Sequence, residues 1–365
     1  IEKQGTEIWC KIDGVWKKAE KLMVNIGGVW KDGGLAKILS YFGTATPLSV
    51  GRIFLAATSI GDYALFGGGD TGGVSRVANA YDTSLVMTTQ TNLVTARSYL
   101  VAASTSNHAI FAGGQTATNV PSDKVDAYDT VLAKSTPTVL SEAKTFLAAT
   151  AVGSIGVIVG GGRTTVVSAT VNSYNTSLTR STRTSLSAAR EDLAATSVGS
   201  YALFGGGYGS AVSDVVDSYN TSFTRGTPTS LSVARERLAA TSIGDYALFG
   251  GGFISTGVYS DVVDPYNTSL VRGTPIALST ARSNLSATSV GEYAIFGGGY
   301  ASNSVRNALD VVDAFDTSLV RIIPTSLSEK RINLAATSIG DYALFGGGYT
   351  NTSVRTGAVD IYQYK

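Results

Sequence analysis

The chain has 365 residues, of which 15% are charged, and its 28 basic and 27 acidic residues leave a formal net charge of +1. This balance provides no broad basic surface for nucleic acid or an anionic membrane. A single cysteine, Cys10, and a single histidine, His108, exclude an intrachain disulfide and a multi-histidine or cysteine-rich metal site, so we expect no metal and no cofactor. No apolar run is long enough to predict membrane insertion, and no signal-peptide pattern is present.

Residues 1–37 contain one pattern twice. Residues 9–17 read Trp-Cys-Lys-Ile-Asp-Gly-Val-Trp-Lys, and residues 23–31 read Met-Val-Asn-Ile-Gly-Gly-Val-Trp-Lys. Asp-Gly and Gly-Gly suit the two-residue turns of β-hairpins, so each copy predicts a hairpin. Isolated hairpins are marginally stable, which makes residues 1–37 a predicted attachment segment. The tandem Val-Trp-Lys pattern resembles segments of tail- and baseplate-associated proteins of phages and prophages, which implies attachment to other virion or tail proteins.

The rest of the chain is built on a fifteen-residue unit, Leu-Ala-Ala-Thr-Ser-Ile-Gly-Asp-Tyr-Ala-Leu-Phe-Gly-Gly-Gly. It occurs without change at residues 55–69, 238–252 and 334–348, and in altered form at residues 100–114, 147–162, 193–207 and 285–299. Successive copies begin 45 to 49 residues apart, a period typical of propeller blades and solenoid repeats.

Each period predicts four strands. Residues 193–197 and 201–204 flank a turn, and the second run is apolar on both faces, as in a covered strand. Residues 214–219 and 223–228 suit a third and a fourth strand. The last copy ends after its third strand, whereas residues 43–52 match the fourth-strand pattern, so the N-terminal strand is expected to complete the last blade and remove the open sheet edges.

These features predict an all-β, seven-bladed β-propeller with four-stranded blades over residues 38–365. Glycine doublets follow an apolar strand, and a Tyr-Asp or Tyr-Asn pair follows some residues later. In these motifs the chain resembles the kelch-type propellers, which implies the same fold.

Two sets of polar residues recur once per blade, and we expect their members to be hydrogen-bonded within or between blades as a structural ring. The basic set is Arg52, Arg97, Lys144, Arg190, Arg235, Arg282 and Arg331, and the other set is Asn79, Asp126, Asn172, Asp217, Asp264, Asp313 and Asp360. Seven equivalent copies favour a structural role over a functional one.

The copies differ most between the third glycine and the third strand. In a propeller these loops share one face around the central channel, and binding residues occur preferentially on such loops. Unconstrained drift of surface loops would give the same variation. The ligand-binding candidates on this face are Asp70, Gln115, Arg163, Tyr208, Phe253, Tyr300, Asn303, Arg306, Tyr349, Asn351 and Arg355.

The function expected from these features is non-enzymatic, because the acids recur in every blade and form no lone catalytic pair. The first hypothesis is a phage or prophage tail-associated protein, located on the virion or extracellularly, whose propeller recognises a cell-surface glycan or protein. The alternative is a purely structural decoration protein of a virion or filament that contacts only sister proteins.

Overall fold

The computed structural model describes residues 37–302 and 307–365, and within residues 1–36 it describes the backbone of five strands. The chain divides into two compact units, residues 1–39 with Lys365 and residues 40–364.

The first unit contains the two predicted hairpins. β2 (Glu7–Ile12) pairs with β3 (Val15–Lys18), and β4 (Met23–Ile26) pairs with β5 (Val29–Asp32). Ile12 is the partner of Val15 and Ile26 is the partner of Val29, so both hairpins are confirmed. β1 (Glu2–Gln4) adds a third strand beside β2, which the repeat pattern did not predict. The turn residues 13–14 and 27–28 lie outside the described residues.

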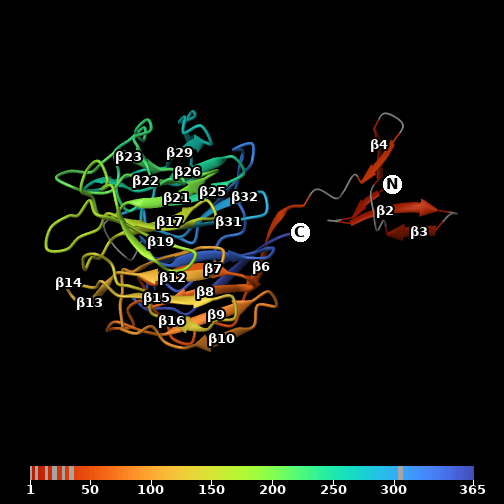
Figure 1. Ribbon diagram of the computed structural model, residues 1–365. Helices are drawn as coiled ribbons and strands as arrows, with labels where there is room; N and C mark the ends of the chain where they lie inside the picture. The colour runs from red at the N-terminus through yellow and green to blue at the C-terminus, as the bar shows by residue number, and fades with distance from the viewer. Residues whose placement is uncertain are drawn as a thin grey trace. The chain divides into compact units, whose positions relative to one another are not determined.

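The second unit is a seven-bladed β-propeller whose sheets are labelled in Figure 1. The first three blades are β7 (Ala56–Ile60), β8 (Tyr63–Gly67), β9 (Ala78–Asp82) and β10 (Met87–Gln90); β11 (Val101–Ser104), β12 (His108–Ala112), β15 (Val125–Asp129) and β16 (Lys134–Ser135); and β17 (Ala148–Val152), β18 (Gly156–Gly160), β19 (Val171–Asn175) and β20 (Arg180–Arg183).

The next three blades follow the same antiparallel order. They are β21 (Ala194–Val198), β22 (Tyr201–Gly205), β23 (Val216–Tyr219) and β24 (Arg225–Gly226); β25 (Ala239–Ile243), β26 (Tyr246–Gly250), β29 (Val262–Asn267) and β30 (Ile276–Ala277); and β31 (Ser286–Val290), β32 (Tyr293–Gly297), β33 (Val312–Asp316) and β34 (Arg321–Ile322).

The seventh blade confirms the predicted closure. It consists of β36 (Ala335–Ile339), β37 (Tyr342–Gly346), β39 (Val359–Tyr364) and, as its fourth strand, β6 (Leu39–Thr44) from the N-terminal side. The first strands of the blades contact one another in cyclic order, and β36 meets β7 to close the circle. Three two-stranded additions complete the unit: β13 (Gln115–Ala117) with β14 (Val120–Pro121), β27 (Phe253–Ser255) with β28 (Val258–Tyr259), and β35 (Arg331–Ile332) with β38 (Tyr349–Thr350).

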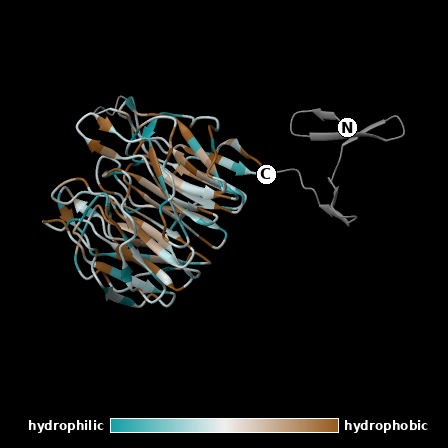
Figure 2. Cartoon of the chain, turned by 90° about the horizontal axis from the view of Figure 1, so that it is seen from above, coloured by the Kyte–Doolittle hydropathy of each residue, from teal (hydrophilic) through white to brown (hydrophobic). Residues whose placement is uncertain are grey.

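The hydrophobic core lies between neighbouring blades, because the second strands are covered on both faces. Strands of the propeller carry hydrophobic residues in Figure 2, and Ala64, Leu65 and Phe66 of β8 have no exposed surface. The first glycine of each triplet makes room for a ring of the next blade, since a Cβ on Gly67 would lie 2.6 Å from the Phe111 ring.

In the second blade, the glycine position and the ring position that it contacts are both changed. It carries Ala112 where most blades carry the glycine, and the residue of the next blade that corresponds to Phe111 is the smaller Val159. Both Ala112 and Val159 lie in the same core cluster. The glycine therefore serves close packing between sheets.

The basic residues of the structural ring are buried and connect the segment before the first strand of each blade to the rest of that blade. All seven basic residues are at most 1% exposed. Six of them donate to the matching acid or amide of the same blade. The distance is 2.7 Å in Arg52–Asn79 and between 2.5 and 2.8 Å in Arg97–Asp126, Arg190–Asp217, Arg235–Asp264 and Arg282–Asp313, and the sixth pair is Arg331–Asp360.

Lys144 departs from the expected pairing. Its Nζ donates to the carbonyl oxygen of Thr170 at 2.7 Å, while the side chain of Asn172 accepts from the backbone N–H of Ser141 at 3.0 Å. A lysine carries one compact donor group, whereas the fork of an arginine reaches several acceptors at once. Burial lowers the pKa of Lys144 to about 8.

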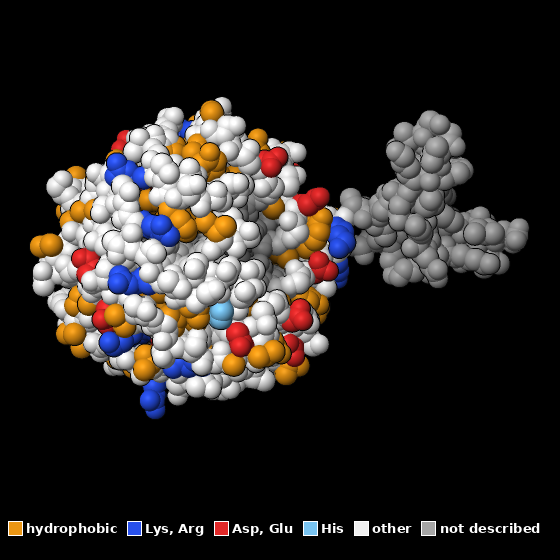
Figure 3. Space-filling view, viewed as in Figure 1, with side chains coloured by type: hydrophobic (Ala, Val, Ile, Leu, Met, Phe, Trp, Pro, Cys, Tyr) orange, Lys and Arg blue, Asp and Glu red, His pale blue; other side chains and the backbone are white. Residues whose placement is uncertain are grey.

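The surface fits the balanced composition. On the face seen in Figure 3, charged side chains are scattered and uncharged polar side chains and backbone cover most of the area. In the part of the chain that the structure describes, no helix is long and apolar enough to cross a bilayer.

Candidate functional site

One residue per blade lines the central channel in a left-handed backbone conformation. These residues, the channel ring, are Phe54, Tyr99, Phe146, Asp192, Arg237, Asn284 and Asn333, with φ between 52° and 55°. Each stands two positions after the buried basic residue of its blade and directly before the leucine of the repeat. A left-handed residue other than glycine is uncommon and costs about 1–3 kcal/mol, so all seven blades impose the same backbone constraint at this position.

Backbone hydrogen bonds connect the channel ring from blade to blade. In six of the seven steps the N–H of a ring residue donates to the carbonyl oxygen of the ring residue before it, at 2.9–3.2 Å. The circle includes the step from Asn333 to Phe54, which joins the last blade to the first. Since these bonds use backbone groups, the backbone of the ring is held independently of which side chains it carries.

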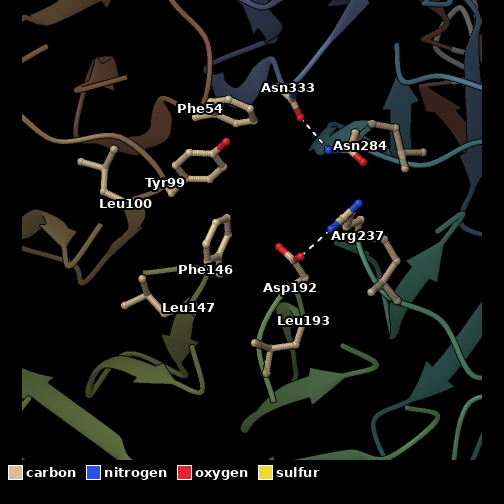
Figure 4. Close-up of a pocket in the computed structure, with 12 residues that line it drawn as sticks. Phe54, Tyr99, Leu100, Phe146, Leu147, Asp192, Leu193, Arg237, Asn284 and Asn333 are labelled. Carbon is tan, nitrogen blue, oxygen red and sulfur yellow. Dashed lines mark hydrogen bonds and ion pairs between the residues drawn. The ribbon is translucent and has the colours of Figure 1, made fainter. Parts of the chain in front are cut away.

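The side chains of the channel ring divide into two arcs, which face each other across the opening in Figure 4. In the aromatic arc, Phe54 and Tyr99 stack with ring centroids 3.8 Å apart, and Phe146 lies 4.5 Å beyond Tyr99. This apolar wall occupies three consecutive blades.

The polar arc occupies the other four blades. Arg237 Nε donates to Asp192 Oδ2 at 3.1 Å, and Asn284 Nδ2 donates to Asn333 Oδ1 at 2.7 Å. The ring thus combines an apolar wall with a set of hydrogen-bonding groups, although the strands beneath it repeat almost identically.

Two hollows meet at the channel ring. The outer one, the mouth cavity, has a volume of about 510 Å³, and Asn119, Arg163, Glu191 and Tyr300 also line it. The inner one, the seat cavity, has about 210 Å³, and leucines of the repeat form the rest of its wall. Further along the channel, a third hollow of about 250 Å³ is lined mainly by alanines and leucines of the first strands. Of these three hollows, the mouth cavity is thus the largest.

Among the residues that the structure describes, two acids and two arginines line the mouth cavity, so the charged side chains of its lining balance. Arg163 Nε donates to Glu191 Oε2 at 2.6 Å, and this bond raises the pKa of Arg163. Burial raises the pKa of Asp192, an effect that Arg237 opposes. Glu236, which is not part of the lining, lies 3.9 Å from Arg237, and burial raises its pKa as well.

Burial also raises the pKa of Tyr99 to about 12. Its hydroxyl group therefore keeps its proton at neutral pH and remains available as a hydrogen-bond donor at the centre of the aromatic arc.

The sequence-predicted loop residues lie next to the channel ring. The first residue after each glycine triplet forms a backbone bridge with the residue that precedes the ring residue of its own blade. These residues are Asp70, Gln115, Arg163, Tyr208, Phe253, Tyr300 and Tyr349. Arg163 and Tyr300 line the mouth cavity.

The other predicted loop residues that the structure describes are not part of the lining of the mouth cavity. Arg355 Nε donates to Asp70 Oδ1 at 2.9 Å, which links the last blade to the first, and Asn351 is exposed. Tyr259 of β28 contacts the rings of Phe253 and Tyr300 edge to face. Asn303 and Arg306 lie outside the described residues.

None of the channel-ring residues was among the predicted candidates. The available signal was the position before the repeat leucine, which holds five residue types in seven copies although the leucine after it is constant and the residue two positions before it is always basic.

The fold and site define the protein as a seven-bladed β-propeller with four-stranded blades and an asymmetric ring in its channel. The sequence matches no protein-family model and no curated protein. Among the residues that the structure describes, no group of three His, Cys, Asp or Glu side chains is placed to hold a metal ion.

Proposed function

We propose that the protein is a non-enzymatic recognition module that binds a cell-surface glycan at the mouth of its channel. The observation that carries the proposal is the asymmetry of the channel ring. Seven nearly identical blades hold one backbone position in the same conformation, yet three adjacent copies are aromatic and four are polar. A purely structural role gives no reason for this division, because the backbone circle and the buried basic residues already hold the ring.

The chemistry of the two arcs suits a sugar. A pyranose ring presents apolar C–H groups on one face and hydroxyl groups around its edge. Phe54, Tyr99 and Phe146 provide the aromatic surface, and the polar arc provides acceptors and donors opposite to it. An apolar wall with a few placed polar groups is the usual composition of a small-molecule site.

The proposal includes no chemical step. Asp192 and Glu191 are both hydrogen-bonded to arginines, at 3.1 Å from Arg237 and 2.6 Å from Arg163. Arginine remains protonated at all physiological pH values and holds these carboxylates as acceptors. A fixed acceptor set of this kind suits binding.

We place this module on a phage or prophage particle, as a kelch-like propeller attached through residues 1–37. The tandem Val-Trp-Lys pattern supports the attachment, and the glycine doublets with the Tyr-Asp or Tyr-Asn pairs support the kelch likeness. The tail and baseplate proteins of the same particle would then be the partners of the N-terminal segment.

The test is a screen of the full chain on a microarray of bacterial and neutral oligosaccharides, followed by calorimetric titration. Tyr99→Asn removes the centre of the aromatic arc but inserts a residue type that two other blades carry at the same φ. Val131→Ser, at a position that is 78% exposed in a turn between strands, is the matched control. We expect Tyr99→Asn to abolish glycan binding and Val131→Ser to retain it.

Absence of binding to every glycan, or equal binding by both variants, would refute the proposal. A particle structure in which sister proteins cover the mouth would instead support a decoration protein without a receptor.

A further inference from the structure

Building on the proposed function, we infer that the channel ring seats the terminal, uncharged sugar of a glycan, which enters end-on along the channel axis. The small volume of the seat cavity, the pairing of the ring's own charges and the mixture of donors and acceptors support this inference independently.

The first support is the size of the seat. The cavity has about 510 Å³ at the mouth and about 210 Å³ at the seat, and the ring residues line both. Pockets that enclose a whole drug-sized ligand usually have about 300–1,000 Å³, so the seat cavity suits a single sugar ring. An internal unit of a polysaccharide continues in two directions, but beyond the seat the channel is lined mainly by alanines and leucines of the first strands, which give a second chain direction few side-chain hydrogen-bonding partners. This arrangement therefore favours a chain end at the seat.

The second support is charge. Asp192 and Arg237 neutralise each other in the polar arc. A carboxylated or sulfated sugar would have to compete with Asp192 for Arg237, while the other lining arginine, Arg163, is already bonded to Glu191. A protonated amino sugar would compete with Arg237 for Asp192 in the same way. Each charge of the polar arc already has a partner of opposite sign, so a charged sugar gains no free counter-charge there and an uncharged unit is preferred.

The third support is hydrogen bonding. Arg237 uses Nε for Asp192, and its two terminal NH₂ groups extend the donor set. The Asn284–Asn333 bond leaves the Nδ2 group of Asn333 as a donor, and the carboxylate of Asp192 remains an acceptor on the same arc. Neighbouring sugar hydroxyls both donate and accept, which matches alternating groups of this kind.

The experiment uses trisaccharides that end in glucose, galactose, mannose or N-acetylglucosamine. Each is titrated beside the disaccharide without its terminal residue and beside the analogue whose terminal C6 is a carboxylate. We expect at least one trisaccharide to bind, and removal or oxidation of its terminal residue to weaken binding by at least about tenfold, since the hydrogen bonds of the polar arc are lost. The methyl glycoside of that residue should compete.

A variant of the channel ring tests whether the terminal sugar lies in the seat cavity. Asp192→Asn keeps the ring conformation, since asparagine occupies the position in two blades, but removes the partner of Arg237. This variant should bind the carboxylated analogue better, relative to the neutral trisaccharide, than the wild type does.

Three outcomes would overturn the inference. Affinity that grows with the number of internal units and is unaffected by removal of the chain end would show side-on binding, and would leave the proposed glycan function intact. Stronger binding of the carboxylated analogues by the wild type would refute the uncharged seat alone. Failure of every glycan on the microarray would refute the proposed function itself, and this inference with it.

Discussion

Replacement of Asp264 by asparagine tests the role of the structural ring, because another blade contains the replacement naturally. Asp264 accepts from Arg235 at 2.7 Å and from Arg272 at 3.3 Å, and Arg235 has no exposed surface. In the first blade the corresponding group is Asn79, which accepts from Arg52 at 2.7 Å and faces Met87, an uncharged residue, in place of the second arginine. The first blade therefore indicates which second change should compensate.

The single variant Asp264→Asn leaves two arginines without a carboxylate. Breaking a buried ion pair by removing one partner costs about 3–5 kcal/mol. The double variant Asp264→Asn with Arg272→Met removes the second cation and reproduces the chemistry of the first blade. We expect it to recover about 1–2 kcal/mol of the loss, as a coupling between contacting residues.

Urea unfolding followed by circular dichroism measures these differences. Arg272→Met alone is the control and should cost about 1 kcal/mol or less, because the arginine side chain is 25% exposed and Arg235–Asp264 stays intact. If the double variant is no more stable than Asp264→Asn, or if Asp264→Asn unfolds like the wild type, the account of the structural ring is wrong.

Gly205→Ala places a Cβ 2.7 Å from the Phe249 ring and should destabilise the protein by about 1–3 kcal/mol. Adding Phe249→Val should restore stability, because Ala112 and Val159 form this combination naturally. Calorimetric unfolding of the single and the double variant measures both effects. Burial lowers the pKa of Lys144 from 10.5 to about 8, so the unfolded chain binds more protons between these values. The contribution of Lys144 to the free energy of unfolding should therefore rise by about 2 kcal/mol from pH 7 to 9.5. Urea unfolding measures this gain, which should be absent in Lys144→Met.

The fold could be predicted from the sequence because the blades are near copies. The period and the apolar second strands predicted four-stranded blades, and the match of residues 43–52 to the fourth-strand pattern predicted that β6 completes the seventh sheet. Matched pairs such as Ala112 with Val159 were not predicted, since the residues that meet between sheets stand in different repeats.

The candidate site could be predicted only in part. Variation after the glycines led to residues beside the channel ring, and two of them, Arg163 and Tyr300, line the mouth cavity. The channel ring was missed because neither its left-handed backbone nor the meeting of seven distant positions can be read from a local pattern. Phe54 and Asn333, for example, are joined by a backbone hydrogen bond although almost the whole propeller separates them in the sequence.

The two rings explain how a repetitive protein can carry an asymmetric site. The buried basic residue of each blade fixes the segment that leads into the first strand, and the ring residue follows two positions later. Backbone hydrogen bonds then join the ring residues at 2.9–3.2 Å. Because neither set of contacts depends on the ring side chain, aromatic, charged and amide residues occupy the same conformation with φ between 52° and 55°. Specificity can therefore change at this position while the blades remain near copies of one another.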